Sequence, residues 1–447
     1  MNDRGKAVVV LSGGNAPGAL EFVVWLTRRF KRHRIPVYGT RHGFKPLMNG
    51  SDGNGLVRLN ADRLASAGPG SIPLISFGRS GPGTDVEQAA SVIRRLLKWN
   101  VKYLIGYGGE GTANTMLSLE RAARRIEAEG GGRICIGMGP KSIDRDLSLS
   151  SDTIGFQTKS ALLGEMLRRI SYDAWMSDDR WFVVVVQGRT VGHLAWRAAI
   201  QSDAAVWLIP EQFTEKVDFS LIVDIIVGAM LKGLIHGQSQ GRARPQTARM
   251  HGHIVVSEGL PLCIREGTCP EFGRMNFDER GRPKLAEFPL HTVLSDAVNA
   301  ALGELRVAER LGGNGISLKG QQLGYTARGA EPNSVDRELA RELATALVHQ
   351  LVKEELSGVV PFIDGESIGH VALEHLVGED RNTINPRQVN IHADRYQTEW
   401  DAARELRLVP EDLGNEQTLS ALVGLTTLSR EAFLARFSRI AEWGDKV

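Results

Sequence analysis

The stretch VKYLIGYGGEGT, residues 101–112, carries the clearest indication of how this chain folds. Its first half is almost entirely apolar, as in a strand that is buried on both faces. Its second half is a glycine-rich turn that leads into a helix-like segment at 112–128. In open α/β sheets, ligands bind beyond the carboxyl ends of the strands. The stretch therefore predicts a parallel sheet with a binding loop at its edge.

The same order of strand, turn and helix recurs along the chain. Further strands are expected at 7–14, 133–139, 181–188, 204–211 and 253–260, and helices at 18–32 and 191–201. Apolar strands that alternate with helices are typical of a parallel sheet covered on both faces. We therefore predict an α/β fold with two doubly wound, largely parallel-sheet lobes and an appended helical C-terminal region.

The length of 447 residues exceeds what one hydrophobic core usually holds. We expect a first lobe at 1–150, joined by part of 330–385, a second lobe at 151–330, and a helical extension at 386–447. The polar, basic stretch 236–252 is interpreted as a surface loop, with a phosphate-holding role for its arginines as the alternative.

Charge, hydropathy and cysteine content exclude several classes of function. The chain has 54 Lys+Arg against 52 Asp+Glu, so its bulk charge suggests no nucleic-acid partner. No apolar run is long enough to span a bilayer, and the N-terminus lacks a signal-peptide pattern. Three cysteines, Cys135, Cys263 and Cys269, cannot all pair, which fits a reducing cytoplasm. We expect a cytoplasmic protein without a membrane partner.

Two glycine-rich turns predict a site for phosphate groups. LSGGNAPGAL, residues 11–20, and GGEGT, residues 108–112, each follow an expected strand. Glycine lets backbone N–H groups face a phosphate, and a helix start at Thr112 adds the positive end of its dipole. Glu110 lies among these donors and is predicted to bind Mg²⁺, which neutralises phosphate oxygens.

The stretch GMGPKSIDRDLSLS, residues 137–150, follows another expected strand and carries Lys141, Ser142, Asp144 and Asp146. Two carboxylates two residues apart repel each other unless a cation or a reacting proton lies between them. Asp144 is predicted to be the general base for a substrate hydroxyl, with Asp146 setting its field and position. Lys141 and Ser142 would hold the group in transfer. The alternative is a capped loop whose aspartates accept backbone hydrogen bonds.

Cationic side chains near the expected strands add to this set. Several of them suggest phosphate clamps at two places, one for a donor and one for a phosphorylated acceptor. The candidates are Arg79, Arg180, Arg189, Lys319 and Arg328, with Tyr325 between the last two.

Taken in order, these loops resemble those of the phosphofructokinase family. LSGGNAPG is similar to its first glycine turn, GGEGT to its GGDG[ST] loop, and PKSIDRD to its P-[GK]-TID-x-D catalytic loop. TIGFQT, QGRTVG, IPE and LGYTARG follow where the family has related motifs. The similarity runs from about residue 6 to residue 340.

The resemblance implies transfer of a phosphoryl group to the 1-hydroxyl of fructose 6-phosphate with Mg²⁺ as cofactor. Asp144 would take the hydroxyl proton with the help of Asp146, and the transferred group would meet Ser142, Lys141 and Arg189. Donor phosphates would be held by Gly13, Gly14, Arg79, Gly109, Gly111 and Thr112. Fructose 6-phosphate would be bound by Arg180, Gln187, Gly188, Glu211, Lys319, Tyr325 and Arg328. Glu211 would contact the sugar hydroxyls, and Lys319, Tyr325 and Arg328 would hold the 6-phosphate. The family reaches a neighbouring subunit's site with the arginine that corresponds to Arg180, so a homodimer or homotetramer is expected.

The family uses either ATP or pyrophosphate as donor, and two positions of this chain disagree about which. Gly111 is the ATP-type residue, because an aspartate there would repel the α-phosphate by ~4 kcal/mol at about 4 Å and an effective dielectric constant near 20. Lys141 is the pyrophosphate-type residue. We expect ATP, because the missing aspartate removes a barrier whereas the lysine builds none, and a pyrophosphate-dependent enzyme is the alternative.

Two further hypotheses stand beside these. A lipid-kinase or NAD-kinase type of fold also carries GGDG[ST], but it would lack PKSIDRD followed by QGR and IPE. A catalytically weak regulatory subunit of a mixed phosphofructokinase oligomer is suggested by Leu20, Glu110 and Arg145, which depart from the family's usual residues. The intact pair of Asp144 and Asp146 argues against it.

Overall fold

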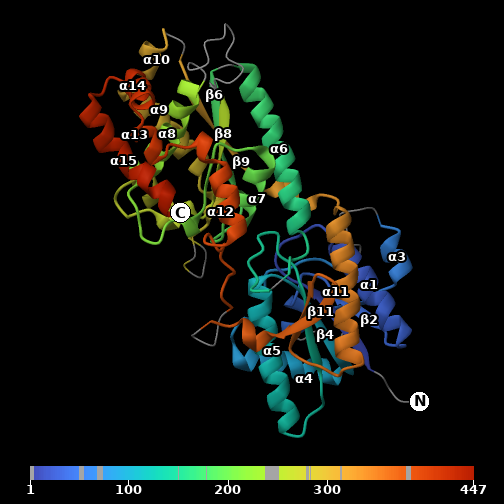
Figure 1. Ribbon diagram of the computed structural model, residues 1–447. Coiled ribbons are helices and arrows are strands. Elements are labelled where there is room, and N and C mark those ends of the chain that lie inside the picture. Colours follow the sequence, from blue (N-terminus) through green and yellow to red (C-terminus); the bar gives the residue numbers. More distant parts are fainter. Residues whose placement is uncertain are drawn as a thin grey trace. The chain divides into compact units, whose positions relative to one another are not determined.

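The computed structural model of the protein (Figure 1) describes residues 5–49, 55–67, 74–149, 151–177, 179–236, 251–277, 281, 283–312, 315–378 and 384–447. Most of the stretch expected to be a basic surface loop, 237–250, lies outside the described residues. The chain divides into two compact units. One comprises Met1–Lys159 and Tyr325–Arg387, and the other comprises Ser160–Gly324 and Gln388–Val447.

The first unit is built on a seven-stranded sheet with the order β11-β10-β5-β4-β1-β2-β3. The five inner strands are parallel, whereas the edge strands β3 and β11 run antiparallel to their neighbours. The strands are β1 (Lys6–Leu11), β2 (Val37–Thr40), β3 (Leu56–Arg58), β4 (Val101–Gly108), β5 (Cys135–Pro140), β10 (Val359–Asp364) and β11 (Ser367–Ala372).

Helices cover both faces of this sheet, as alternate side chains of β1 show. Val8 and Val10 pack into one core with α4 and α5, and Ala7 and Val9 pack into the opposite core with α1 and α11. This burial on both faces explains why the inner strands are continuously apolar. The helices are α1 (Ala19–Arg32), α2 (Lys45–Met48), α3 (Ala61–Ala65), α4 (Val86–Lys98), α5 (Glu110–Ala128) and α11 (Ser334–Val352), with 3₁₀ turns η5 (Tyr325–Gly329) and η6 (Leu373–Leu376).

The second unit has a four-stranded, all-parallel sheet with the order β7-β8-β6-β9. Its strands are β6 (Arg180–Val186), β7 (Val206–Leu208), β8 (Gly252–Ser257) and β9 (Ser317–Leu323). Helix α6 (Phe156–Ser177) begins in the first unit and continues in the second. The other helices are α7 (His193–Ser202), α8 (Phe219–His236), α9 (Leu290–Glu304) and α10 (Val307–Arg310), with 3₁₀ turns η1 (Pro210–Gln212), η2 (Leu260–Cys263), η3 (Pro270–Arg274) and η4 (Leu285–Glu287).

The C-terminal helices belong to the core of the second unit. They are α12 (Asp394–Ala402), α13 (Pro410–Gly414), α14 (Glu416–Gly424) and α15 (Arg430–Lys446), with a 3₁₀ turn η7 (Arg404–Leu406). Phe433 and Phe437 of α15 share one hydrophobic cluster with strand β6 and helix α8, beside which α15 lies in Figure 1. An ion pair ties α13 to the same unit, since the Nζ of the buried Lys232 in α8 lies 2.6 Å from Asp412 Oδ2.

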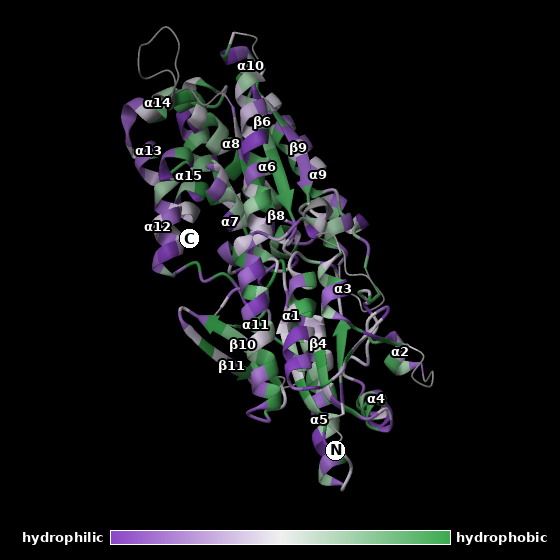
Figure 2. Ribbon diagram, turned by 90° about the vertical axis from the view of Figure 1, so that its right-hand side faces the viewer, coloured by the Kyte–Doolittle hydropathy of each residue, from purple (hydrophilic) through white to green (hydrophobic). Residues whose placement is uncertain are grey.

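The predicted α/β class with parallel sheets and a helical C-terminal region is confirmed. Each predicted strand is present, and Figure 2 shows β4 and β8 in the colour of hydrophobic residues. The sequence did not reveal β9, because SLKGQQL is largely polar and lies half-exposed at the edge of its sheet. None of the helices that the structure describes has the length and apolar content that a membrane span requires.

Candidate active site

Three of the predicted loops lie side by side in the first unit, at the carboxyl ends of the adjacent strands β5, β4 and β1. The backbone N–H of Ser12 donates to the carbonyl of Tyr107 (2.9 Å), and that of Lys141 donates to the carbonyl of Gly108 (2.9 Å). The parallel sheet therefore brings together the two glycine turns and the loop with the aspartates.

Gly78, the residue before Arg79, is hydrogen-bonded to the first glycine turn. Gly78 pairs with Ser12 in a parallel bridge, and its carbonyl accepts a hydrogen bond of 2.9 Å from the N–H of Gly13. Arg79 follows directly and is exposed. The predicted donor-binding residues Gly13, Gly14 and Arg79 thus come from neighbouring segments.

Lys141 is buried beside the same turn. Its Nζ donates a hydrogen bond of 2.9 Å to the carbonyl of Gly14 and lies 5.8 Å from the ring centroid of Phe77. Burial lowers the pKa of Lys141 to about 8, against the opposing effect of Asp146 and Asp144. The nearby charges of Arg328 and Arg79 contribute to this lowering of the pKa. The turn is therefore surrounded by cationic groups.

Arg328 lies against this turn in the first unit. Its guanidinium lies 4.9 Å from the ring centroid of Tyr325, and a Cβ added to Gly14 would lie 2.5 Å from Arg328 Nη1. Lys319 belongs to β9 of the second unit, opposite Phe182 of β6. The sugar-phosphate role that the resemblance implies for Arg328, Tyr325 and Lys319 stays a prediction.

The loop between β5 and α6 presents the two predicted carboxylates differently. Ser142 Oγ donates a hydrogen bond of 2.5 Å to Asp146 Oδ1, as expected for a carboxylate that stabilises its own loop. Asp144 is buried, and its Oδ1 accepts no hydrogen bond from the residues that the structure describes. Asp144 thus has a buried carboxylate oxygen to which the described residues donate no hydrogen bond.

The residue between the two aspartates has a left-handed backbone. Arg145 has φ 60°, its Nε lies 2.6 Å from Asp152 Oδ1, and its guanidinium lies 5.5 Å from the ring centroid of Phe156. Arg387 holds the loop from the other side, since its backbone N–H donates to the carbonyl of Asp146 (2.9 Å). The loop conformation is thus fixed by contacts outside the loop.

The second glycine turn faces Asp146. A Cβ added to Gly109 would lie 3.9 Å from Asp146 Oδ1, and the half-buried Glu110 follows as the first residue of α5. Within the described ranges, no group of three or more His, Cys, Asp or Glu residues could hold a metal ion. The carboxylate of Glu110 beside the turn is the kind of ligand that Mg²⁺ takes, because proteins usually bind this ion through one or two carboxylates together with substrate phosphates and water.

Two glycines of this turn have different roles. A Cβ added to Gly108 would lie 2.0 Å from the Oγ1 of the buried Thr112, so only glycine fits there. A Cβ added to Gly111 would meet nothing within 4 Å among the described residues, and Gly111 is exposed. Packing therefore does not require glycine at position 111.

In the second unit, the predicted residues Gln187, Gly188 and Arg189 follow strand β6. The backbone N–H groups of Gly188 and Arg189 donate to Glu258 Oε1 at 3.2 and 2.7 Å. Glu258 is buried just beyond strand β8, next to β6 in the sheet. The sequence analysis missed Glu258, although its place at the carboxyl end of an expected strand was a usable signal.

Glu211 lies in the turn η1 of the second unit. Its Oε1 accepts hydrogen bonds from the backbone N–H groups of Gly192 (2.9 Å) and Val389 (3.0 Å). Its Oε2 is buried and accepts none from the part of the chain that the structure describes. Burial raises the pKa of Glu211, and the backbone hydrogen bonds partly offset this effect.

Arg180 lies at the opposite end of β6 from Gln187, because it begins the strand. It pairs with Asp173 of α6 at 3.3 Å, and its side chain is partly exposed. Its predicted contact with a neighbouring subunit stays a prediction.

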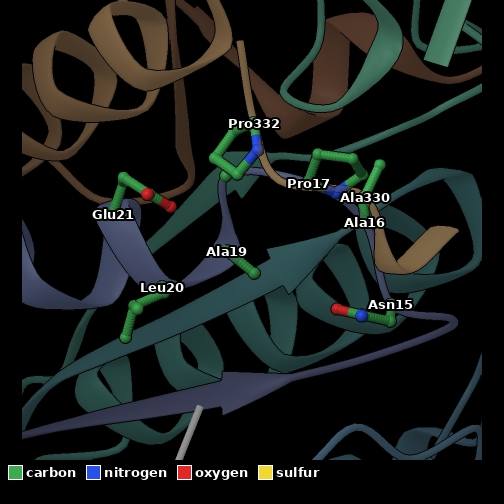
Figure 3. Close-up of a pocket in the computed structure, with 9 residues that line it drawn as sticks. Asn15, Ala16, Pro17, Ala19, Leu20, Glu21, Ala330 and Pro332 are labelled. Carbon is green, nitrogen blue, oxygen red and sulfur yellow. The ribbon is translucent and has the colours of Figure 1, made fainter. Parts of the chain in front are cut away.

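A small pocket lies where the first glycine turn enters α1 (Figure 3). It is lined by Asn15, Ala16, Pro17, Leu20 and Glu21 among others, and by Ala330 and Pro332 from the segment after η5. None of the predicted catalytic side chains lines this pocket.

Comparison with known proteins matches the phosphofructokinase family model to residues 6–351. Two relatives named pyrophosphate–fructose 6-phosphate 1-phosphotransferase, from Naegleria fowleri and Thermotoga maritima, are each 27% identical over 97% of this chain, and the matches cover 95% and 98% of those proteins. An ATP-dependent 6-phosphofructokinase from Oceanobacillus iheyensis is 26% identical over 78% of this chain and 86% of its own length.

Solved structures share the fold. A pyrophosphate-dependent phosphofructokinase from Marinobacter aquaeolei has a TM-score of 0.59 and 16% identity, and the match covers 90% of this chain and 91% of that one. Phosphofructokinase from Saccharomyces cerevisiae has a TM-score of 0.60 and 22% identity over 83% of this chain, which spans 45% of the yeast chain. The resemblance seen in the ordered loops is confirmed by the family match, and the chain belongs to the phosphofructokinase family, whose members are enzymes that transfer a phosphoryl group to a hydroxyl group.

Proposed function

We propose that this protein transfers a phosphoryl group from pyrophosphate to the 1-hydroxyl of fructose 6-phosphate, with Mg²⁺ as cofactor. The observation that carries the proposal is the meeting of a buried lysine, two glycine turns and a carboxylate pair at the carboxyl ends of β1, β4 and β5. Phosphoryl transfer needs positioning and charge neutralisation more than covalent chemistry from the protein.

Asp144 is the proposed general base. A carboxylate that removes the hydroxyl proton as the oxygen attacks needs an oxygen that is not consumed by its own loop. Among the described residues, none of this loop donates a hydrogen bond to Asp144 Oδ1, whereas Asp146 accepts one from Ser142. The loop therefore leaves the carboxylate of Asp144 available for the proton. Asp146 is proposed to assist Asp144 by adding negative charge beside it and by keeping the loop in position.

The donor phosphates are proposed to lie over the glycine turns. Lys141, Arg79 and Arg328 supply positive charge around Gly13 and Gly14. Gly109, Gly111 and Thr112, at the start of α5, supply the amino end of a helix, which favours anions. Mg²⁺ would be held by Glu110 together with donor oxygens, and it would neutralise charge on the phosphates when bound.

Fructose 6-phosphate is proposed to be bound by the residues that the family resemblance assigns to it. The candidates are Arg180, Gln187, Gly188, Arg189, Glu211, Lys319, Tyr325 and Arg328. Glu258 supports two of them, because its Oε1 accepts hydrogen bonds from the backbone N–H groups of Gly188 and Arg189. Glu211 is proposed to accept a hydrogen bond from a sugar hydroxyl at Oε2, because the described residues donate none to this oxygen. The role of Arg180 implies a homodimer or homotetramer.

The choice of pyrophosphate departs from the donor that the sequence analysis favoured. Two relatives that match almost the whole chain carry a pyrophosphate-dependent name, and the buried ammonium of Lys141 suits a small, highly charged donor. ATP is the second candidate, because glycine at position 111 contributes no carboxylate that would repel an α-phosphate.

Initial rates with fructose 6-phosphate and Mg²⁺ test the proposal, with pyrophosphate and ATP supplied separately and fructose 1,6-bisphosphate detected by a coupled aldolase reaction. We expect turnover with pyrophosphate. Turnover with ATP alone would select the second candidate. Absence of turnover with either donor would contradict both and would favour a regulatory subunit.

A further inference from the structure

A buried lysine outside the predicted set lies beside the proposed base. Lys159 belongs to the first turn of α6, and its side chain has 0% exposure. Its Nζ lies 4.0 Å from Asp144 Oδ1, the oxygen that accepts no hydrogen bond from the described residues. A lysine side chain is almost never buried this fully unless it is paired.

The main chain holds the two residues in a fixed relationship. The start of α6 is capped by Asp336 of α11, which accepts hydrogen bonds from the backbone N–H groups of Gly155 (2.9 Å) and Thr158 (2.7 Å). Thr153 Oγ1, just before α6, donates to the carbonyl of Ser142 at 2.6 Å. The segment that carries Lys159 is therefore tied to the loop that carries Asp144.

The two oxygens of Asp144 have different surroundings. Oδ1 is buried and faces the ammonium of Lys159, whereas the side chain as a whole keeps 11% exposure. The exposed part of the side chain is thus not Oδ1. A carboxylate held at one oxygen by an ion pair presents its other oxygen in a defined direction, which is what a general base requires.

We propose that Lys159 is a positioning residue for the phosphoryl-transfer reaction: its ammonium holds Asp144 through Oδ1, so that the other carboxylate oxygen accepts the proton of the sugar hydroxyl. The proposal rests on the proposed function of Asp144 as base. Lys159 itself touches no reacting atom, and the proton passes from the hydroxyl oxygen to Asp144.

Lys159→Met tests the proposal, because it keeps the length of the side chain and removes the charge. We expect kcat to fall about tenfold or more, a part of the 10²–10⁴-fold that a positioned base contributes. The KM for fructose 6-phosphate should change less than about twofold, since ground-state binding of the sugar is untouched. Unchanged kcat in Lys159→Met would overturn the proposal.

A matched control separates positioning from loss of a buried charge. Lys232→Met in α8 also removes a buried ammonium, which pairs there with Asp412. It should lower the thermal midpoint without a specific loss of kcat. If Lys159→Met lowers kcat only as far as Lys232→Met does, the proposal fails.

Double-mutant cycles complete the test. If Lys159 acts through Asp144, adding Lys159→Met to Asp144→Asn should reduce kcat no further, whereas a merely structural role would give multiplicative losses. The same cycle on the free energy of unfolding needs no substrate. Non-additive changes in the free energy of unfolding support an interaction between Lys159 and Asp144, and additive changes overturn it. This result can be obtained even if the wild-type protein shows no activity and the proposed function has failed.

Discussion

The ammonium of Lys141 donates a hydrogen bond of 2.9 Å to the backbone carbonyl of Gly14. This contact joins the loop after β5 to the turn after β1, across a separation of 127 residues in the chain. It places a positive charge beside the backbone of a glycine turn that is itself suited to a phosphate.

The charge of Lys141 should make donor use depend on pH. Because burial lowers its pKa to about 8, the ammonium is charged below that pH and is lost as the pH rises through it. We expect kcat/KM for the donor, which reports groups of the free enzyme, to fall above about pH 8. Lys141→Arg should abolish this fall, because a guanidinium stays charged.

The control for this profile is Lys98→Arg on the exposed face of α4, which should leave it unchanged. A wild-type kcat/KM that stays level from pH 7 to about pH 9.5 would show that Lys141 does not supply the charge for the donor.

Removal of the proposed base should abolish most of the activity without unfolding the protein. We expect Asp144→Asn to lower kcat by about 10²–10⁴-fold, because the amide cannot accept the hydroxyl proton. Asp364→Asn, at the exposed end of β10, is the matched control and should keep wild-type kcat. Comparable activity of the two variants would rule Asp144 out as the base.

An aspartate at position 111 should act on ATP alone. The open space beside Gly111 admits the side chain, and its charge would repel an α-phosphate by ~4 kcal/mol, which corresponds to about a thousandfold in binding. Gly111→Asp should therefore keep turnover with pyrophosphate and abolish any turnover with ATP. Gly111→Asn controls for size, and an equal loss with both donors in both variants would refute the electrostatic explanation.

Gly192 should be needed to keep Glu211 in place. A Cβ there would lie 2.4 Å from Ile209 Cβ and 2.7 Å from Glu211 Oε2. We expect Gly192→Ala to raise the KM for fructose 6-phosphate and to lower the free energy of unfolding by about 1–3 kcal/mol, as overpacking does. Gly303→Ala is the control, because a Cβ there meets nothing within 4 Å among the described residues. Wild-type KM in Gly192→Ala would argue against a role of Glu211 in sugar binding.

The parts of the fold that could be predicted are those with a strong local pattern. Strands β1, β4, β5, β6 and β8 are apolar on both faces because helices cover both sides of each sheet, and such runs are visible in the sequence. The edge strand β3 spans only three residues, and β11 is largely exposed. Neither carries a pattern that distinguishes it from a loop.

The same distinction applies to the site. The glycine turns and the aspartate loop were predictable as a group, since parallel strands bring their carboxyl ends to one edge. Lys159 was not, because a lysine in the first turn of a helix usually faces solvent and only the fold buries it beside Asp144. The start of the helix that carries Lys159 is capped by Asp336, which is 178 residues from Thr158 in the chain. No local sequence pattern reveals a contact over that separation.

The most direct test of the account follows the phosphorus atoms themselves. Purified protein is incubated with fructose 6-phosphate, Mg²⁺ and pyrophosphate, and the reaction is followed by ³¹P NMR. The account predicts that the pyrophosphate signal is replaced by orthophosphate and by a new phosphate ester on C1 of the sugar, and that Asp144→Asn slows both changes equally. If the spectrum of the sugar stays unchanged both with pyrophosphate and with ATP, Asp144 does not activate this hydroxyl for phosphoryl transfer.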